Sequence, residues 1–215
     1  MDKIKRISKA EEAKNDLSPA YYSSLNHELP STVKLRVYLI DNDFKTINIE
    51  QDCKVKDLIE LLSRKMGIED YENFGIFEEW SKGGKPDERL LANEQVLSDL
   101  GNKKTQKKLV IKCRVFRELN IINANDATTH LYYIQTKYCI LSGYYFAGII
   151  NATALATIQM QIEFGPYSPN KHKIGFMQSR IRDFVSTILL EKYGAKHMEY
   201  QILQTYSTSS SVNFT

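Results

Sequence analysis

The chain has 215 residues, of which 42% are apolar and 26% charged, a composition typical of one or two soluble globular domains. Its net charge of +3 is too small for a nucleic-acid-binding protein that relies on its overall charge. The three cysteines, Cys53, Cys113 and Cys139, lack the spacing of metal ligands. The sequence therefore predicts a reduced cytoplasmic protein that holds no metal and no cofactor.

The first 30 residues mix basic and acidic side chains without apolar periodicity, so we expect a flexible N-terminal segment over 1–30. They contain no apolar core of a signal peptide. Farther along, no charged residue occurs from Tyr138 to Ile162, a run long enough to cross a bilayer. The glycines and polar side chains within that run favour two shorter buried helices joined by a loop.

Residues 31–117 have the patterns of a compact α+β domain. Alternating apolar residues indicate strands, and apolar residues at helical spacing followed by Gly67 indicate a helix with its C-cap. The predicted elements are strands over 33–39 and 47–49, a helix over 55–66, and strands over 74–77 and 109–115. This is the order of a ubiquitin-like fold; an unrelated small α+β domain is the alternative.

Residues 118–206 change to helical periods and predict an all-α domain, which a polar tail over 207–215 follows. Asn151 is a candidate N-cap for the helix that carries Leu155, Ile158 and Ile162. The predicted helices fall within 131–141, 151–162, 181–189 and 198–206. We expect the junction of the two domains near residues 117–123.

Catalytic motifs are absent from the sequence. His130 and Cys139 lie nine residues apart and fall on different faces of one predicted helix, so they cannot form a nucleophile pair. No hydrolase, metalloprotease or nucleotide-binding signature occurs. We therefore expect no catalytic residue and no enzyme activity.

Two clusters of basic residues form the candidate site. The first basic cluster has seven positive charges in a stretch without an acidic residue: Lys103, Lys104, Lys107, Lys108, Lys112, Arg114 and Arg117. The second basic cluster lies on a predicted loop and at helix ends: Lys171, His172, Lys173, Arg180, Arg182, Lys192, Lys196 and His197. Each basic residue near an anionic membrane contributes about 1 kcal/mol to binding. The alternatives are a solvated sheet edge for the first cluster and interaction with a helix dipole for part of the second.

Two segments carry a resemblance to a known family. Residues 159–176 read QMQIEFGPYSPNKHKIGF and resemble the second lobe of FERM domains of the talin branch, in which a QIQFGP…KHK.GF pattern is typical. The segment that begins VKLRVYLIDNDFKTINI at Val33 resembles the ubiquitin-like first lobe of the same domains. The resemblance covers about residues 33–206.

The resemblance implies an α+β architecture, in which a ubiquitin-like β-grasp lobe over 31–117 precedes an acyl-CoA-binding-protein-like helical lobe over 118–206. The helical lobe lacks the long final helix of its relatives, so we expect it to be truncated. No part of the sequence matches the third, PTB-like lobe, and integrin-tail binding is therefore not expected. In talin-like second lobes, lysines at the positions of Lys173 and Lys196 belong to a membrane-orienting patch, although Glu191 falls where that patch is usually basic.

The leading hypothesis is a non-enzymatic membrane–cytoskeleton adaptor at the cytoplasmic face of the plasma membrane. It would bind anionic phospholipids, including phosphoinositides, peripherally and would contact cytoskeletal or adhesion proteins. The predicted phospholipid-binding residues are Lys103, Lys104, Lys107, Lys108, Lys171, His172, Lys173, Lys192 and Lys196. The alternative is a soluble protein–protein interaction scaffold whose charges only keep it in solution.

Overall fold

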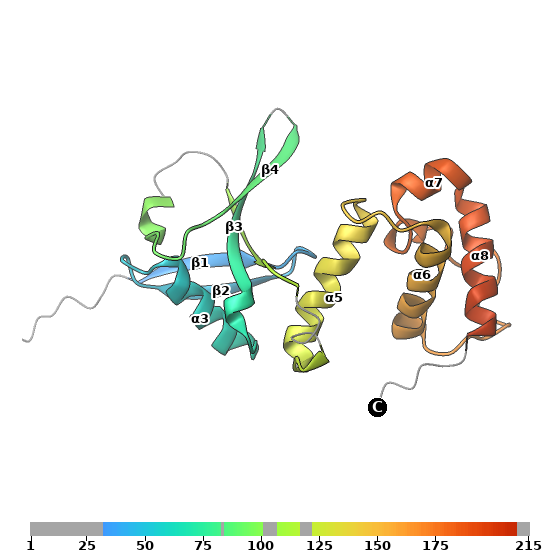
Figure 1. Cartoon of the computed structure of the whole chain (residues 1–215), viewed down its shortest axis with the longest axis horizontal. Helices are drawn as coiled ribbons and strands as arrows, with labels where there is room; N and C mark the ends of the chain where they lie inside the picture. The colour runs from blue at the N-terminus through green and yellow to red at the C-terminus, as the bar shows by residue number, and fades with distance from the viewer. Residues whose placement is uncertain (1–31, 83, 101–106, 117–121, 210–215) are drawn as a thin grey trace, which may run out of the picture.

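The computed structural model describes residues 32–82, 84–100, 107–116 and 122–209 (Figure 1). The predicted flexible segment over 1–30 lies outside the described residues. Of the expected polar tail, residues 207 and 208 belong to the last helix and residues 210–215 are not described. The elements are β1 (Val33–Tyr38), β2 (Phe44–Ile49), α3 (Val55–Met66), η1 (Tyr71–Asn73), β3 (Phe74–Lys82), β4 (Lys85–Leu90), η2 (Leu97–Leu100), β5 (Lys108–Cys113), α5 (Asp126–Leu141), α6 (Ile149–Phe164), η3 (Ile181–Asp183), α7 (Thr187–Tyr193) and α8 (Ala195–Thr208).

The described strands form one mixed five-stranded sheet in the order β2-β1-β5-β3-β4. β1 and β5 are parallel, and the other neighbours are antiparallel. The hairpin predicted from the alternation of apolar residues is confirmed, because Leu35 on β1 pairs with Ile47 on β2. The β3–β4 hairpin extends away from the rest of the sheet (Figure 1).

Helix α3 packs its apolar face on the sheet and closes the first hydrophobic core. It ends at Gly67, which adopts the left-handed conformation at φ 71° and so confirms the predicted C-cap. Leu58 and Leu62 have no solvent exposure and lie in one cluster with Phe74 and Ile76 of β3. Burial of such side chains stabilises the fold by about 1.5–3 kcal/mol each.

Helix α5 packs on the ubiquitin-like sheet and lies between it and the remaining helices (Figure 1). Its N-cap Asn125 accepts a hydrogen bond from the Thr128 N–H and donates one to the Gly67 carbonyl oxygen. Gln135 both accepts from the Cys113 N–H, at 2.7 Å, and donates to the Cys113 carbonyl oxygen, at 2.9 Å. The buried side chain of Leu131 joins the first core. This arrangement fixes the position of α5 relative to β5.

The second hydrophobic core belongs to α6, α7, α8 and the segment between α6 and α7. Met160 of α6 and Ile202 of α8 are both fully buried, and Met177 of the connecting segment is 1% exposed. The two predicted helices within the uncharged run are confirmed as α5 and α6. The predicted last helix is also confirmed, as α8.

Two local predictions for the helical half are wrong. Helix α6 begins at Ile149 with Gly148 as its N-cap, not at Asn151. The helix expected over 181–189 divides into η3 and α7. At the break, the Gln159 side chain donates to the Asp183 carbonyl oxygen, at 3.0 Å, and Ser186 takes an extended conformation as the N-cap of α7.

Candidate functional site

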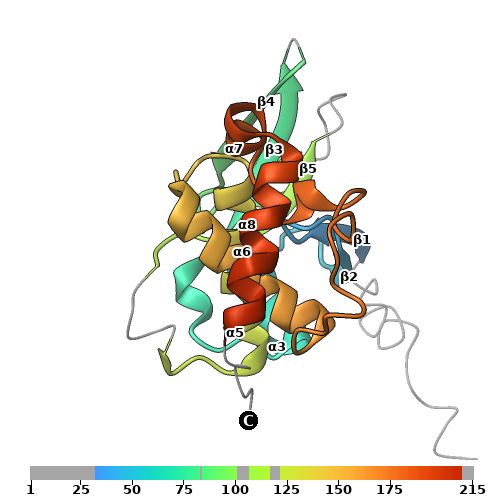
Figure 2. The same cartoon turned by 90° about the vertical axis from the view of Figure 1, so that its right-hand side faces the viewer.

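The loop lysines of the second basic cluster lie on a segment that runs beside α8 (Figure 2). Lys171 and Lys173 have exposed side chains, whereas His172 between them is only 4% exposed. The loop therefore presents its two ammonium groups to solvent and turns the intervening imidazole into the lobe.

The burial of His172 corrects the expectation that it belongs to a membrane-facing surface. Four aromatic rings enclose it, with centroids 4.9 Å (Phe176), 5.0 Å (Tyr206), 5.7 Å (Tyr167) and 6.3 Å (Phe164) away. Its Nδ1 accepts a hydrogen bond from the Ser168 N–H at 2.9 Å. Burial and, to a smaller extent, the nearby charge of Lys171 lower the pKa of His172. The residue anchors the loop and adds no charge to its surface.

Lys192 and Lys196 are exposed at the end of α7 and the start of α8. The Lys192 Nζ lies 5.1 Å from the ring centroid of Tyr193, and that ring stacks on His197. Glu191 is exposed in the same turn of α7 and offsets part of the positive charge.

A buried carboxylate joins the loop to α8. The Glu199 Oε1 accepts hydrogen bonds from the Gly175 N–H, at 2.9 Å, and from the Met177 N–H, at 2.8 Å. Glu199 follows Lys196 by nearly one helical turn, so the contact attaches the loop to the first part of α8, where Lys196 also lies. Sequence reasoning missed Glu199, although it falls at helical spacing with Ile202 and Leu203 on the apolar face of α8, where a charged residue is unusual.

The first basic cluster differs from its prediction, because carboxylates of β3 and β4 neutralise much of it. The Lys107 Nζ lies 2.9 Å from Glu78 Oε2, and the Arg89 Nε lies 2.7 Å from the same oxygen. The Glu78 side chain is 1% exposed. Burial opposes its ionisation, but the hydrogen bonds from Lys107 and Arg89 outweigh that effect and lower its pKa.

Among the described lysines of the first cluster, Lys112 is the most deeply buried, with 8% of its surface exposed. Its Nζ lies 2.7 Å from Glu79 Oε1 and also forms an ion pair with Glu88. Burial disfavours the charged ammonium, yet the bonds to the two carboxylates raise its pKa. The sequence contains no acidic residue over 101–117, so only the β3–β4–β5 pairing reveals these partners.

The other members of the first cluster vary in their exposure. Lys108 donates to Asn42 Oδ1 at 2.7 Å and lies 4.6 Å from the ring centroid of Tyr38. Arg114 donates to the Glu72 carbonyl oxygen at 2.6 Å. Lys103, Lys104 and Arg117 lie outside the described residues. The two clusters thus differ in their lysines. Lys171, Lys173, Lys192 and Lys196 of the second cluster are exposed, although its Arg180 pairs with Glu163 and Asp183. The first cluster uses its described lysines within the fold.

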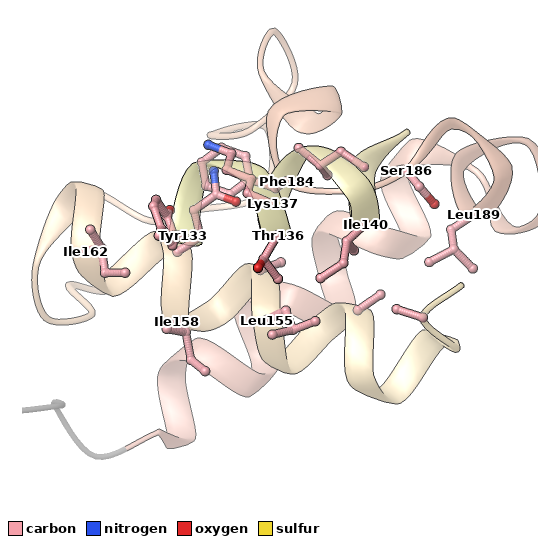
Figure 3. A pocket seen from close by; sticks show the side chains of 15 residues that line it. Tyr133, Thr136, Lys137, Ile140, Leu155, Ile158, Ile162, Phe184, Ser186 and Leu189 are labelled. Atoms are coloured by element: carbon pink, nitrogen blue, oxygen red, sulfur yellow. The ribbon is translucent and has the colours of Figure 1, made fainter. Parts of the chain in front are cut away.

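An apolar cavity of about 180 Å³ separates α5 from α6 (Figure 3). Its lining includes Tyr133 and Ile140 of α5 and Leu155, Ile158 and Ile162 of α6 (Figure 3). The α6 residues Leu155, Ile158 and Ile162, which the sequence places on this helix, are 41–47% exposed. Helix α6 is apolar on most of its surface, and Ala152, Ala156 and Met160 occupy the core instead.

The cysteines lack the environment of a nucleophile. Burial raises the pKa of Cys113 to about 11, because the thiolate would lose its hydration. Burial also raises the pKa of Cys139. Among the residues that the structure describes, no group of three or more His, Cys, Asp and Glu residues could hold a metal ion.

Neither α5 nor α6, each of 16 residues, nor any other helix of the described ranges combines the length and apolar character needed to cross a membrane. The uncharged run from Tyr138 to Ile162 is instead divided between these two helices, as its glycines predicted.

Comparisons of the sequence identify both halves of the chain. Residues 121–213 match the FERM central domain family, and residues 31–129 match the RA-like domain family. FERM domain-containing protein C of Dictyostelium discoideum is 30% identical over 145 residues, which cover 67% of this chain and 9% of that protein. Talin-B of the same organism is 25% identical over 197 residues, which cover 89% of this chain and 7% of that protein. The chain thus spans less than a tenth of these relatives.

Solved structures share the fold at lower sequence identity. The MF2 MyTH4-FERM domain of Dictyostelium discoideum myosin VII has a TM-score of 0.70 at 17% identity, over 91% of this chain and 42% of that one. The FERM domain of Drosophila Merlin has a TM-score of 0.66 at 20% identity, over 83% of this chain and 59% of that one. These likenesses establish the arrangement of a ubiquitin-like lobe and a helical lobe.

Proposed function

Since this chain belongs to the FERM family and is talin-like in both lobes, we propose that it is a non-enzymatic adaptor that binds anionic membranes through the second basic cluster. FERM proteins are adaptors that link the cytoskeleton to membranes. The observation that carries the proposal is the exposure of Lys171, Lys173 and Lys196 on a loop and helix joined by Glu199.

The energetics fit a weak peripheral contact. Three exposed lysines near an anionic surface contribute about 3 kcal/mol together, since each contributes about 1 kcal/mol. Ordinary salt screens such charges over about 8 Å, so binding depends on several lysines acting at once. Lys192 adds a fourth charge, while Glu191 opposes it. We propose a cytoplasmic, membrane-cortex location on this basis, with cytoskeletal or adhesion proteins as partners.

Vesicle cosedimentation tests the proposal. The full chain should sediment with vesicles that contain phosphatidylserine or a phosphoinositide at about 0.1 M salt and should be released at about 0.5 M. Vesicles of phosphatidylcholine alone should leave it in the supernatant. The variant Lys171→Glu/Lys173→Glu/Lys196→Glu should lose most of the binding, and equal binding by this variant and the native chain would contradict the proposal.

The cavity between α5 and α6 favours a second candidate function, a protein-interaction scaffold without direct membrane binding. Its apolar lining, which includes Leu155 and Ile158, suits an apolar side chain better than a charged headgroup. The same cosedimentation experiment separates the two candidate functions, because a scaffold of this kind would not sediment with anionic vesicles more than with phosphatidylcholine vesicles. Under that outcome, Ile158→Gln should weaken capture of a protein partner while the lysine variant should not.

A further inference from the structure

Glu199 is unusual among the described carboxylates of the helical lobe because it is 5% exposed and its partners in the described part of the chain are backbone N–H groups alone. Within the described ranges, no ion pair includes it. Burying a carboxylate without a cation is costly, so its two hydrogen bonds must recover much of the lost hydration. A leucine at this position would fill the core without that cost, which makes the carboxylate itself the feature to explain.

The backbone of the loop is shaped to meet this carboxylate. Gly175 has φ +97°, a conformation that residues with a side chain rarely adopt, and a Cβ built there would meet no atom within 4 Å. The bend directs the N–H groups of residues 175 and 177 at one oxygen, as in the backbone concavities that bind anions. The glycine is therefore required by backbone conformation and not by close packing.

The loop has a second attachment to α8, on the other side of Lys173. The His172 ring lies against Tyr206, and the Tyr206 hydroxyl donates to the Gly165 carbonyl oxygen. Glu199 and Tyr206 are seven residues apart, which is about 10 Å along the helix. Lys173 lies between the two attachments in sequence, and Lys171 precedes His172 directly. Two tethers on one rigid helix thus determine where the loop lysines lie.

We infer that Glu199 is a positioning residue of the membrane-binding surface: its buried carboxylate holds residues 173–177 on α8 and thereby keeps Lys171 and Lys173 on the side of Lys196. The inference rests on the proposed function and assigns an acidic residue a supporting role in an anion-binding surface. A preorganised set of charges binds more tightly than a mobile one, because less conformational freedom is lost on contact.

The test combines hydrogen exchange with vesicle binding in the full chain. Glu199→Ala should accelerate exchange of the Gly175 and Met177 amides and should weaken binding to phosphatidylserine vesicles about three- to tenfold. Glu199→Gln keeps an oxygen acceptor, so its amide exchange should be slower and its vesicle binding tighter than those of Glu199→Ala. Gly175→Ala should reproduce the loosened loop without touching the carboxylate.

A control separates positioning from general loss of stability. Leu189→Ala removes a side chain that is 2% exposed in the same lobe and makes none of the loop contacts described above. At a temperature where the Leu189 and Glu199 variants are equally folded, the Leu189 variant should retain vesicle binding. Equal losses in both variants would overturn the inference.

The remaining outcomes also decide between the claims. Unchanged exchange at Gly175 and Met177 in Glu199→Ala would show that the carboxylate does not hold the loop. Accelerated exchange with undiminished vesicle binding, while Lys171→Glu/Lys173→Glu/Lys196→Glu still loses binding, would remove the positioning role and leave the proposed function standing. If the lysine variant binds as the native chain does, both claims fall.

Discussion

The two basic clusters look alike in the sequence and differ in the folded chain. Lys112 and Lys107 of the first cluster form ion pairs with carboxylates of β3 and β4, so their charge is used within the sheet. Lys171 and Lys173 of the second cluster remain exposed, because the nearby acids bind other groups: Glu199 accepts from backbone N–H groups, and Glu163 and Asp183 pair with Arg180. A run of lysines therefore predicts a binding surface only after the positions of the neighbouring acids are known.

The largest effect should come from removing a paired lysine. Lys112→Met leaves Glu79 and Glu88 without their shared cation and should lower the free energy of unfolding by about 1–3 kcal/mol. Lys173→Met should change it by less than about 0.5 kcal/mol, because the side chain is exposed. Chemical denaturation of both variants at neutral pH measures the two changes in the free energy of unfolding. Equal losses of stability in the two variants would contradict the prediction.

The pH dependence should differ between the two lobes. The folded pKa of His172 is lowered, so the stability it contributes is complete above its ordinary pKa of 6.5 and is lost as the pH falls through the lowered value. The folded pKa of Glu78 is also lowered, so its contribution is complete above 4.5 and is lost only at more acid pH. Acidification should therefore loosen the helical lobe first.

Hydrogen exchange of each lobe between about pH 5 and pH 7 checks this order. His172→Phe keeps an aromatic ring among the four neighbouring rings but cannot titrate. It should therefore remove the pH dependence of hydrogen exchange in the helical lobe over that range. If acidification accelerates exchange in the sheet before it does so in the helical lobe, His172 is not the residue that makes the helical lobe sensitive to acid.

Substitution of Lys108 should have the smallest effect on stability. This lysine contacts other residues of the fold, like Lys112, but it has no ion pair in the described residues, like Lys173. It donates to Asn42 and lies over Tyr38, but no carboxylate pairs with it among the described residues. Lys108→Ala should cost about 0.5–1 kcal/mol of stability and should weaken vesicle binding less than Lys173→Ala does. Parallel denaturation and cosedimentation measure the two effects. A larger loss of vesicle binding than that of Lys173→Ala would extend the membrane surface to the first lobe.

The sequence allowed prediction of features that depend on neighbours along the chain. The β1–β2 hairpin, α3 and the C-cap at Gly67 follow from local periodicity and the special conformations of glycine. The break between η3 and α7 was not predicted this way, and the carbonyl oxygen of Asp183 at this break accepts from Gln159, which lies 24 residues earlier. The ion pair of Lys112 with Glu88 likewise spans 24 residues and exists only through strand pairing.

The two faces of α6 illustrate a different limit. Because this helix is apolar almost all round, its sequence does not say which side enters the core. Met160 is fully buried, whereas Ile158, of similar hydrophobicity, is 45% exposed beside the cavity. For the candidate site, the exposed lysines were predictable from composition, but the burial of His172 and the tether at Glu199 required the packed structure.

The most direct test of the account compares vesicle binding of two variants with the same change of charge. One reverses the second cluster, Lys171→Glu/Lys173→Glu/Lys196→Glu, and the other reverses three exposed residues of the first lobe, Lys34→Glu/Arg36→Glu/Arg64→Glu. On phosphatidylserine vesicles at about 0.1 M salt, the account predicts that the first variant loses binding about tenfold or more and that the second loses much less. Equal losses would mean that net charge alone governs binding, which would contradict a defined surface on the helical lobe.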